Sequence, residues 1–250
     1  MHRYTSYETF FDNIDSEIKS YLLGFFIADG NIRLNDRCKN SYRLGVNISR
    51  DDEYIVKLFQ KYICPNNTIL YTNNQNGVKK RKPVCNIRWT STYMNNILNN
   101  KYNIRSRKTY NYEFEFPFEK IPEEFIWDFI RGFFDGDGHI SYNDTTHNLT
   151  FAFYGTSKLF LEQIGILFEK TFGVSMRIDC SKKKNVSLFC LRFYANWHRK
   201  EFMSALYEKF YQNKKFYLQR KKEKMKKYLM FKYRANLSDC ERLKDSVERS

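Results

Sequence analysis

Two segments of the chain repeat one pattern of aromatic, small and acidic residues. Tyr21–Gly30 reads Tyr-Leu-Leu-Gly-Phe-Phe-Ile-Ala-Asp-Gly, and Phe129–Gly138 reads Phe-Ile-Arg-Gly-Phe-Phe-Asp-Gly-Asp-Gly. The final aspartates, Asp29 and Asp137, stand 108 positions apart (137 − 29). An internal repeat with this spacing divides the chain into two units of similar size. The sequence therefore predicts a duplicated architecture in which each copy of the pattern occupies the same place.

Each unit continues from its motif with the same predicted order: helix, two strands, helix, two strands, helix. The strands are recognised by alternation, as in 43–49, where apolar Leu44, Val46 and Ile48 alternate with polar or small residues. In the first unit we expect helices at 14–29, 51–63 and 92–98, with strands at 32–35, 43–49, 68–72 and 83–90. In the second we expect helices at 122–137, 158–172 and 197–211, with strands at 139–142, 149–155, 174–180 and 186–194. The expected fold class is α+β, with tandem αββαββα repeats and two antiparallel sheets.

The repeat and its flanks define four regions. We expect an N-terminal half at 1–101, a linker at 102–121, a C-terminal half at 122–211 and a basic extension at 212–250. Within the extension, residues 212–234 hold ten Lys or Arg and one acid, Glu223, and their composition is compatible with a helix.

The charge balance indicates the kind of partner. Lys and Arg number 43 against 28 Asp and Glu, a net charge of +15, which favours a polyanion such as nucleic acid over a membrane surface. No stretch reaches the about 18 to 20 apolar residues that a membrane span needs, and the polar start is unlike a signal peptide. The six cysteines form no Cys-x-x-Cys pair. We therefore expect an intracellular protein with reduced thiols and no membrane partner.

Each motif helix carries two small residues one turn apart. These are Gly24 with Ala28 in the first copy and Gly132 with Gly136 in the second. Helices that meet along small residues bring their backbones close together, while bulky neighbours fill the cores on either side. The pattern predicts that the two motif helices pack against each other with their ends side by side.

Asp29 and Asp137 fall at the C-terminal ends of these helices, where a carboxylate faces the negative end of the helix dipole. A structural reading of one copy alone is a helix ending in an Asp-Gly cap. Two copies in register within a basic chain favour a different reading, in which the carboxylates and the carbonyls of the last turn bind Mg²⁺ or another hard divalent cation such as Mn²⁺. Such a site would promote hydrolysis of a phosphodiester by water.

The outward residues of the strands form a second candidate site. Arg, Asn, Thr and Tyr side chains can hydrogen-bond to base edges and phosphates, and a β-ribbon fits the major groove of DNA. Any one of these residues alone is better explained by an ordinary solvated strand face, so the hypothesis rests on the set. The candidate DNA-binding residues on strands are Arg43, Asn47, Ser49, Arg88, Thr150, Tyr154, Arg177 and Arg192.

Two basic loops precede corresponding strands of the two units. We expect phosphate contacts from Lys80, Arg81 and Lys82 in the first loop and from Lys183 in the second. A soluble hairpin tip is the alternative for such a run of lysines.

The two motifs resemble the paired motifs of single-chain LAGLIDADG homing endonucleases, and the resemblance extends over about residues 16–211. It implies a pseudo-twofold monomer whose two sheets form a saddle over double-stranded DNA, with Mg²⁺-dependent cleavage of a long target. The resemblance assigns the catalytic, metal-binding acids to Asp29 and Asp137, and the assisting carbonyls to Ala28 and Gly136. It also implies a basic residue near the site at the end of each half. Ser106–Thr109 and Leu218–Lys221 resemble that segment, which assigns the role to Lys108 and Arg220.

The two copies are not identical. The sixth motif position, usually Asp in the family, is Ile27 in the first copy and Asp135 in the second. We therefore expect an asymmetric site that reads a non-palindromic target.

Two other functions use the same scaffold. An intron RNA maturase would also explain the basic extension, and a non-cleaving DNA-binding protein or transcription regulator would explain the basic strands. Both acids are retained, which favours cleavage, and no helix-turn-helix segment is evident outside the repeat.

Overall fold

The structure is a computed structural model that describes residues 6–35, 41–72, 82–106, 111–183, 186–195 and 200–230. The first half consists of α1 (Glu17–Asp29), β1 (Gly30–Leu34), β2 (Tyr42–Ser49), α2 (Glu53–Ile63), β3 (Leu70–Thr72), β4 (Val84–Thr90) and α3 (Thr92–Tyr102). The second half consists of α4 (Ile126–Asp137), β5 (Gly138–Tyr142), β6 (Leu149–Gly155), α5 (Lys158–Phe172), β7 (Arg177–Lys183), β8 (Val186–Ala195) and α6 (Lys200–Tyr211).

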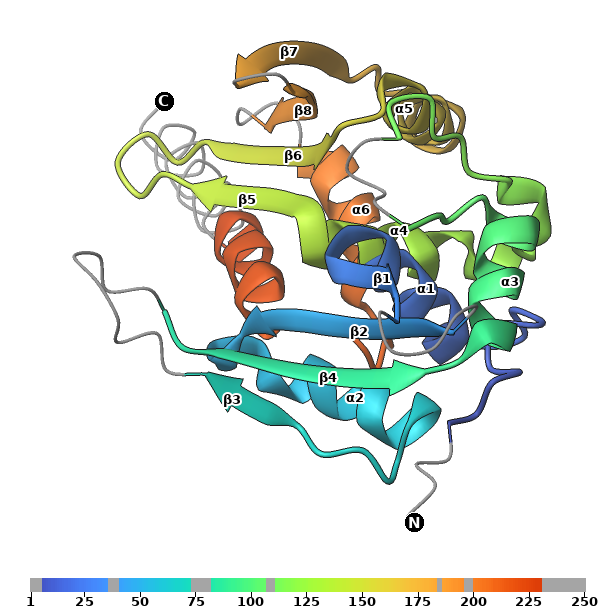
Figure 1. Ribbon diagram of the computed structural model, residues 1–250. Coiled ribbons are helices and arrows are strands. Elements are labelled where there is room, and N and C mark those ends of the chain that lie inside the picture. Colours follow the sequence, from blue (N-terminus) through green and yellow to red (C-terminus); the bar gives the residue numbers. More distant parts are fainter. Residues whose placement is uncertain are drawn as a thin grey trace, which may run out of the picture.

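The strands form two antiparallel four-stranded sheets with the same topology. Their orders are β1-β2-β4-β3 and β5-β6-β8-β7, so the strand that follows each motif helix lies at the inner edge of its sheet. Figure 1 shows the two sheets one above the other, with α1 and α4 between them. The predicted fold class, a tandem αββαββα repeat, is confirmed.

The helix boundaries follow local capping. Helix α5 covers the predicted range because the Ser157 hydroxyl accepts from the N–H of Phe160 at 3.3 Å, and Gly173, at φ +63°, ends it. Helix α3 runs four residues beyond its predicted end at Leu98, to Tyr102, where Asn103 adopts a left-handed conformation (φ 59°). Helices α1 and α4 begin later than predicted, and a 3-10 turn at Glu123–Phe125 precedes α4.

The alternating strands place one face against the helices. Leu44, Val46 and Ile48 of β2 are buried, as the pattern predicted, and Phe151 and Phe153 of β6 are buried as well. The core is rich in aromatic pairs, among them the stacked rings of Phe134 and Phe151 at 4.3 Å. No helix in the described part of the chain has the length and apolar character that crossing a membrane requires.

Helices α1 and α4 meet along the small residues that the sequence indicated. A Cβ atom on Gly24 would lie 2.0 Å from the carbonyl oxygen of Phe129, and one on Gly132 would lie 2.0 Å from that of Tyr21. No side chain fits at such distances, so the two backbones are in direct contact at both points. The predicted close packing of the motif helices is confirmed.

The described residues that follow α6 pack into the fold. Leu218, Met225 and Tyr228 are buried, and a helix spans residues 219–230. In Figure 1 this helix lies between β5 and β2, at the left of the view. Its lysines reach the inner edge of the second sheet, since Lys224 Nζ donates to the Ile140 carbonyl at 3.1 Å. Lysines that contact an open strand edge also protect it from pairing with another chain.

Candidate active site and nucleic-acid face

The two motif aspartates lie where the helices converge. Asp29 is the last residue of α1 and Asp137 the last residue of α4, and each helix continues into the inner strand of its sheet without a loop. A Cβ atom on Gly136 would lie 2.2 Å from the Ala28 Cβ and 3.2 Å from the Asp29 Oδ2. The carboxylate of the first half therefore lies against the helix end of the second half.

A buried lysine occupies the end of α4. Lys221 is 2 % exposed, and its ammonium donates to the carbonyls of Phe134, Asp135 (2.8 Å) and Gly138 (2.6 Å). A cation at a helix C-terminus offsets the negative end of the dipole and satisfies carbonyls that have no partner within the helix. Burial lowers the pKa of Lys221 to about 8, although nearby carboxylates favour its charged form. The structure thus places a positive charge beside Asp137.

The neighbouring Arg220 has a different partner. Its guanidinium pairs with Asp52, just before α2, at 3.0 to 3.2 Å, and its side chain is 52 % exposed. Residue Lys108 lies outside the described residues. The sequence supports an alignment of the two basic segments other than the one that matched Lys108 with Arg220. Arg107-Lys108 and Arg220-Lys221 are the same dipeptide. Aligning those dipeptides matches Lys108 with Lys221.

The sixth motif residue of the second copy is also buried. Asp135 Oδ2 accepts from the Tyr21 hydroxyl at 3.0 Å and from the N–H of Leu218 at 2.7 Å. Burial raises the pKa of Asp135 above its usual value, while Lys221 and the hydrogen bonds oppose that shift. Ile27, its counterpart in the first copy, is a buried apolar residue. The two halves of the site therefore differ in their supporting contacts.

The strand registers place the predicted polar residues of the first sheet on one face. Arg43 pairs with Thr90, Gly45 with Arg88, and Asn47 with Asn86, so their side chains project on the side opposite the helices. Strand β1 adds two residues to this face that the sequence interpretation missed, Asn31 and Arg33. They could have been found by extending the alternation from Ile32, which is buried.

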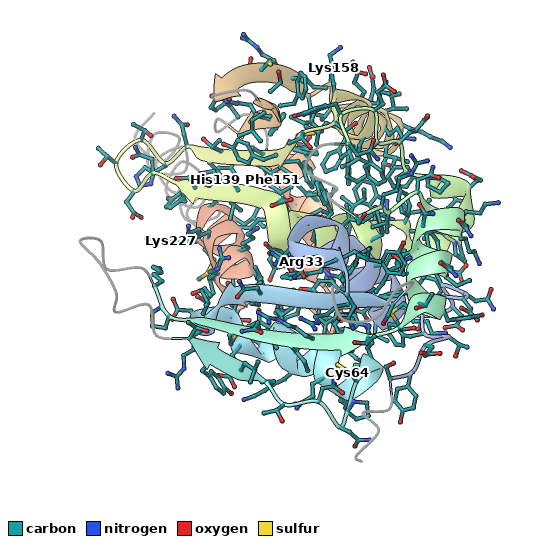
Figure 2. All side chains as sticks on the ribbon, in the orientation of Figure 1. Arg33, Cys64, His139, Phe151, Lys158 and Lys227 are labelled. Atoms are coloured by element: carbon teal, nitrogen blue, oxygen red, sulfur yellow. The ribbon has the colours of Figure 1, made fainter. Side chains whose placement is uncertain are left out.

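The second sheet presents a corresponding face. Thr150 pairs with Tyr194, and Ala152 with Arg192, so the outward set contains the predicted Thr150, Tyr154, Arg177 and Arg192. Asp179 pairs with both arginines, at 2.7 Å to Arg177 and 3.2 Å to Arg192. His139 and Ser141 of β5 join this face and were not foreseen. Figure 2 shows Arg33 near the centre, between the sheets, and His139 on the upper sheet.

The predicted loop contacts are only partly described. Lys80 and Arg81 lie outside the described residues, and Lys183 belongs to β7, although its side chain is not among those described. Lys82 is exposed, with its ammonium 3.7 Å from Asp51. Among the described residues, no group of three or more His, Cys, Asp or Glu side chains converges.

The comparisons with known proteins agree with this geometry. The sequence pattern of the LAGLIDADG-like domain matches residues 124–216, and no curated protein sequence matches the chain. The I-LtrWI LAGLIDADG homing endonuclease bound to target DNA is similar in structure, with 12% identity, 91% of this chain and 93% of that chain covered, and a TM-score of 0.51. The homing endonuclease I-WcaI bound to its DNA recognition sequence is 16% identical, with 87% of this chain and 91% of that chain covered and a TM-score of 0.50. I-DmoI in complex with DNA and Ca is 19% identical, with 77% of this chain and 90% of that chain covered and a TM-score of 0.47.

The fold and the paired helix ends define the class: the chain is a LAGLIDADG-fold protein of the single-chain, two-motif type. The match to the LAGLIDADG-like domain lies in the C-terminal half.

Proposed function

We propose that the protein is a site-specific endonuclease that hydrolyses phosphodiester bonds of double-stranded DNA at a long, asymmetric target. The observation that carries the proposal is the approach of the Asp29 carboxylate of the first half to Gly136, which precedes Asp137 at the end of the motif helix of the second half. Both solved relatives with TM-scores of 0.50 and 0.51 were determined on DNA, which supports the choice of substrate.

The converging groups fit a hard divalent cation, Mg²⁺ or Mn²⁺. Asp29 and Asp137 offer carboxylate oxygens, and Ala28 and Gly136 offer carbonyls in the last turns of their helices. Gly136 leaves room for this arrangement, because any side chain there would press on the Asp29 carboxylate. When bound, the cation lowers the pKa of a water nucleophile and neutralises charge on the phosphate.

Lys221 contributes a fixed positive charge. An ammonium has three N–H donors, and those of Lys221 are directed at three backbone carbonyls. It therefore acts on an approaching phosphate through its field, by offsetting the dipole of α4 beside Asp137. We propose Lys221, in addition to Lys108 and Arg220, as a basic residue of the site.

The outward faces would position the DNA. Exposed arginines at Arg33, Arg43 and Arg88 suit the phosphates and base edges of one half-site, and the second sheet offers Thr150, Tyr154 and Arg192 for the other. Because both carboxylates come from one chain, a monomer suffices for activity. The different side chains on the two faces favour a target without twofold symmetry.

The decisive experiment is cleavage of DNA that spans the insertion junction of the element encoding the protein. With Mg²⁺, we expect the wild type to cut both strands, and Asp29→Asn or Asp137→Asn to lose cutting by orders of magnitude while retaining DNA binding. Asp144→Asn serves as the matched control, because Asp144 is exposed in the turn after β5 and pairs with Lys227. Normal cutting by both active-site variants would refute the assignment of the site.

The described part of the extension favours one alternative. Lys224, Lys226 and Lys227 are exposed on the helix 219–230, and such a basic helix also suits RNA. An intron RNA maturase would bind its intron RNA more tightly than the junction DNA and cut no DNA. Competition of the labelled RNA by unlabelled junction DNA separates the two functions.

A further inference from the structure

The segment that joins α6 to the helix 219–230 is held by side chains from both halves of the molecule. We call residues 214–221 the strap. It has little regular structure before residue 219, and its last residue is Lys221, whose ammonium reaches the end of α4. Because an irregular segment has few hydrogen bonds of its own, its position depends on the side chains that bind its backbone.

The beginning of the strap is bound at the other end of the motif helices. Glu17 Oε1, in the first turn of α1, accepts from the N–H of Lys215 at 3.0 Å. Arg131, fully buried in α4, donates to the Phe216 carbonyl at 2.8 Å and to Glu17 at 2.9 Å. A carboxylate of the first half and a guanidinium of the second thus hold adjacent strap residues.

The middle of the strap is bound by one residue from each half of the molecule. Asp135 of α4 accepts from the N–H of Leu218 at 2.7 Å. On the flanking residues, the Tyr54 hydroxyl donates to the Tyr217 carbonyl at 2.6 Å and accepts from the N–H of Gln219 at 2.9 Å. Tyr54 belongs to α2, in the N-terminal half. One hydroxyl therefore fixes the strap two residues before Lys221.

We propose that Tyr54 is a positioning residue of the active site, which acts from the N-terminal half by holding the strap so that Lys221 stays at the end of α4. The proposal rests on the proposed function for its catalytic consequence, but the placement of Lys221 can be measured without it. It explains why a tyrosine that is 38 % exposed carries two backbone hydrogen bonds to a segment 163 residues away.

The energetic consequence of losing the hydroxyl is local. The Tyr217 carbonyl and the N–H of Gln219 lie at the surface, so water can replace Tyr54, and global stability changes little. The strap, however, gains freedom, because the Tyr54 attachment is removed and only Asp135 and the ion pair between Asp52 and Arg220 still hold residues 217–220. Lys221 should then leave its buried site more often.

The test uses Tyr54→Phe in the full chain, with Tyr71→Phe as the matched control. Tyr71 donates its hydroxyl to Glu53 of α2 at 3.0 Å and does not touch the strap. The first readout is the rate of acetylation of Lys221 by acetic anhydride, followed by peptide mass spectrometry on the DNA-free protein. We expect an increase of about fivefold in Tyr54→Phe, the factor that corresponds to one neutral hydrogen bond, and no change in Tyr71→Phe.

Lys214 is the internal reference, because it begins the strap and pairs with Asp128 at 2.7 Å, away from Tyr54. Unchanged protection of Lys221 in Tyr54→Phe overturns the proposal, and so does an equal rise at Lys214, which would mean general loosening. The acetylation result decides the placement even if the wild type cuts no DNA, an outcome that would refute only the proposed function.

The second readout is single-turnover cleavage of the junction DNA. We expect Tyr54→Phe to lower the cleavage rate with unchanged DNA affinity, by a smaller factor than the rise in acetylation because Lys221 still occupies its site most of the time, and to have no further effect in a Lys221→Met background. Full additivity of the two substitutions would show that Tyr54 does not act through Lys221.

Discussion

Gly136 leaves its side of the helix interface open, and the Asp29 carboxylate of the opposite half lies against it, with Oδ2 only 3.2 Å from where a Cβ would stand. One helix interface therefore positions Asp29 against the end of α4, the helix that carries Asp137. Any change that separates α1 from α4 disturbs stability and the site together.

The glycine contacts of this interface predict that a single added methyl group strongly destabilises the protein. Gly24→Ala places a Cβ 2.0 Å from the Phe129 carbonyl, a backbone atom that cannot turn away as a side chain would. We expect a loss of about 3 kcal/mol or more in the free energy of unfolding, because the helices must move apart. Urea denaturation followed by circular dichroism measures it.

Gly165→Ala is the control for this substitution. Gly165 also lies in a helix, α5, but its added Cβ would meet only Leu191 Cδ1 at an ordinary 3.5 Å. There we expect a gain of about 0.5 to 1 kcal/mol from the better helix propensity of alanine. Equal effects of the two substitutions would contradict the close contact.

The architecture could be predicted because the same pattern of helices and strands occurs twice in the sequence. The alternation at Leu44, Val46 and Ile48 predicts the inward face of β2, and the small residues at Gly24 and Gly132 predict the helix interface. Both signals are local, since they depend on the periods of strand and helix. Element ends were less predictable, because a single left-handed residue such as Asn103 decides where α3 stops.

The contacts around the site were less accessible to sequence reasoning. Arg220 and Lys221 are adjacent and both basic, and composition does not tell which one points to α4 and which one to Asp52. Tyr54 gives no signal at all, because its hydroxyl meets a segment of irregular backbone far along the chain. Such contacts arise only from tertiary packing, which periodicity does not encode.

The pKa of Lys221 predicts a specific pH dependence of stability. Burial lowers it from 10.5 to about 8, so between about pH 8 and pH 10.5 the unfolded chain binds more protons at this residue than the folded one. The free energy of unfolding must then rise with pH across that window at this site, by about 3 kcal/mol, and stay flat below it.

The measurement is the difference in unfolding free energy between the wild type and Lys221→Met, taken by urea denaturation at several pH values from about 6 to 10. Taking the difference removes the titration of the other residues. We expect the free energy of unfolding of the wild type to rise relative to that of the variant above about pH 8. A constant difference would show that the buried ammonium has its ordinary pKa, and a difference that falls with pH would show that its pKa is raised.

The cross-strand arginines of the first sheet predict that one substitution raises the stability of the protein and weakens its binding to DNA. Arg33 of β1 lies directly opposite Arg43 of β2, both are exposed, and like charges in this position repel each other. A phosphate between them would turn that repulsion into binding energy. We expect Arg43→Ala to raise the free energy of unfolding of the DNA-free protein by about 0.2 to 1 kcal/mol.

The same substitution should weaken DNA binding and lower the slope of log affinity against log salt by about 1, the signature of one lost phosphate contact. Arg50→Ala is the control, because Arg50 lies over the Tyr71 ring outside the strand pair. An Arg43→Ala protein with unchanged stability and an unchanged salt slope would show that this pair faces water rather than a polyanion. If affinity falls while the slope stays the same, Arg43 reads a base edge, and the phosphate contact belongs to Arg33 alone.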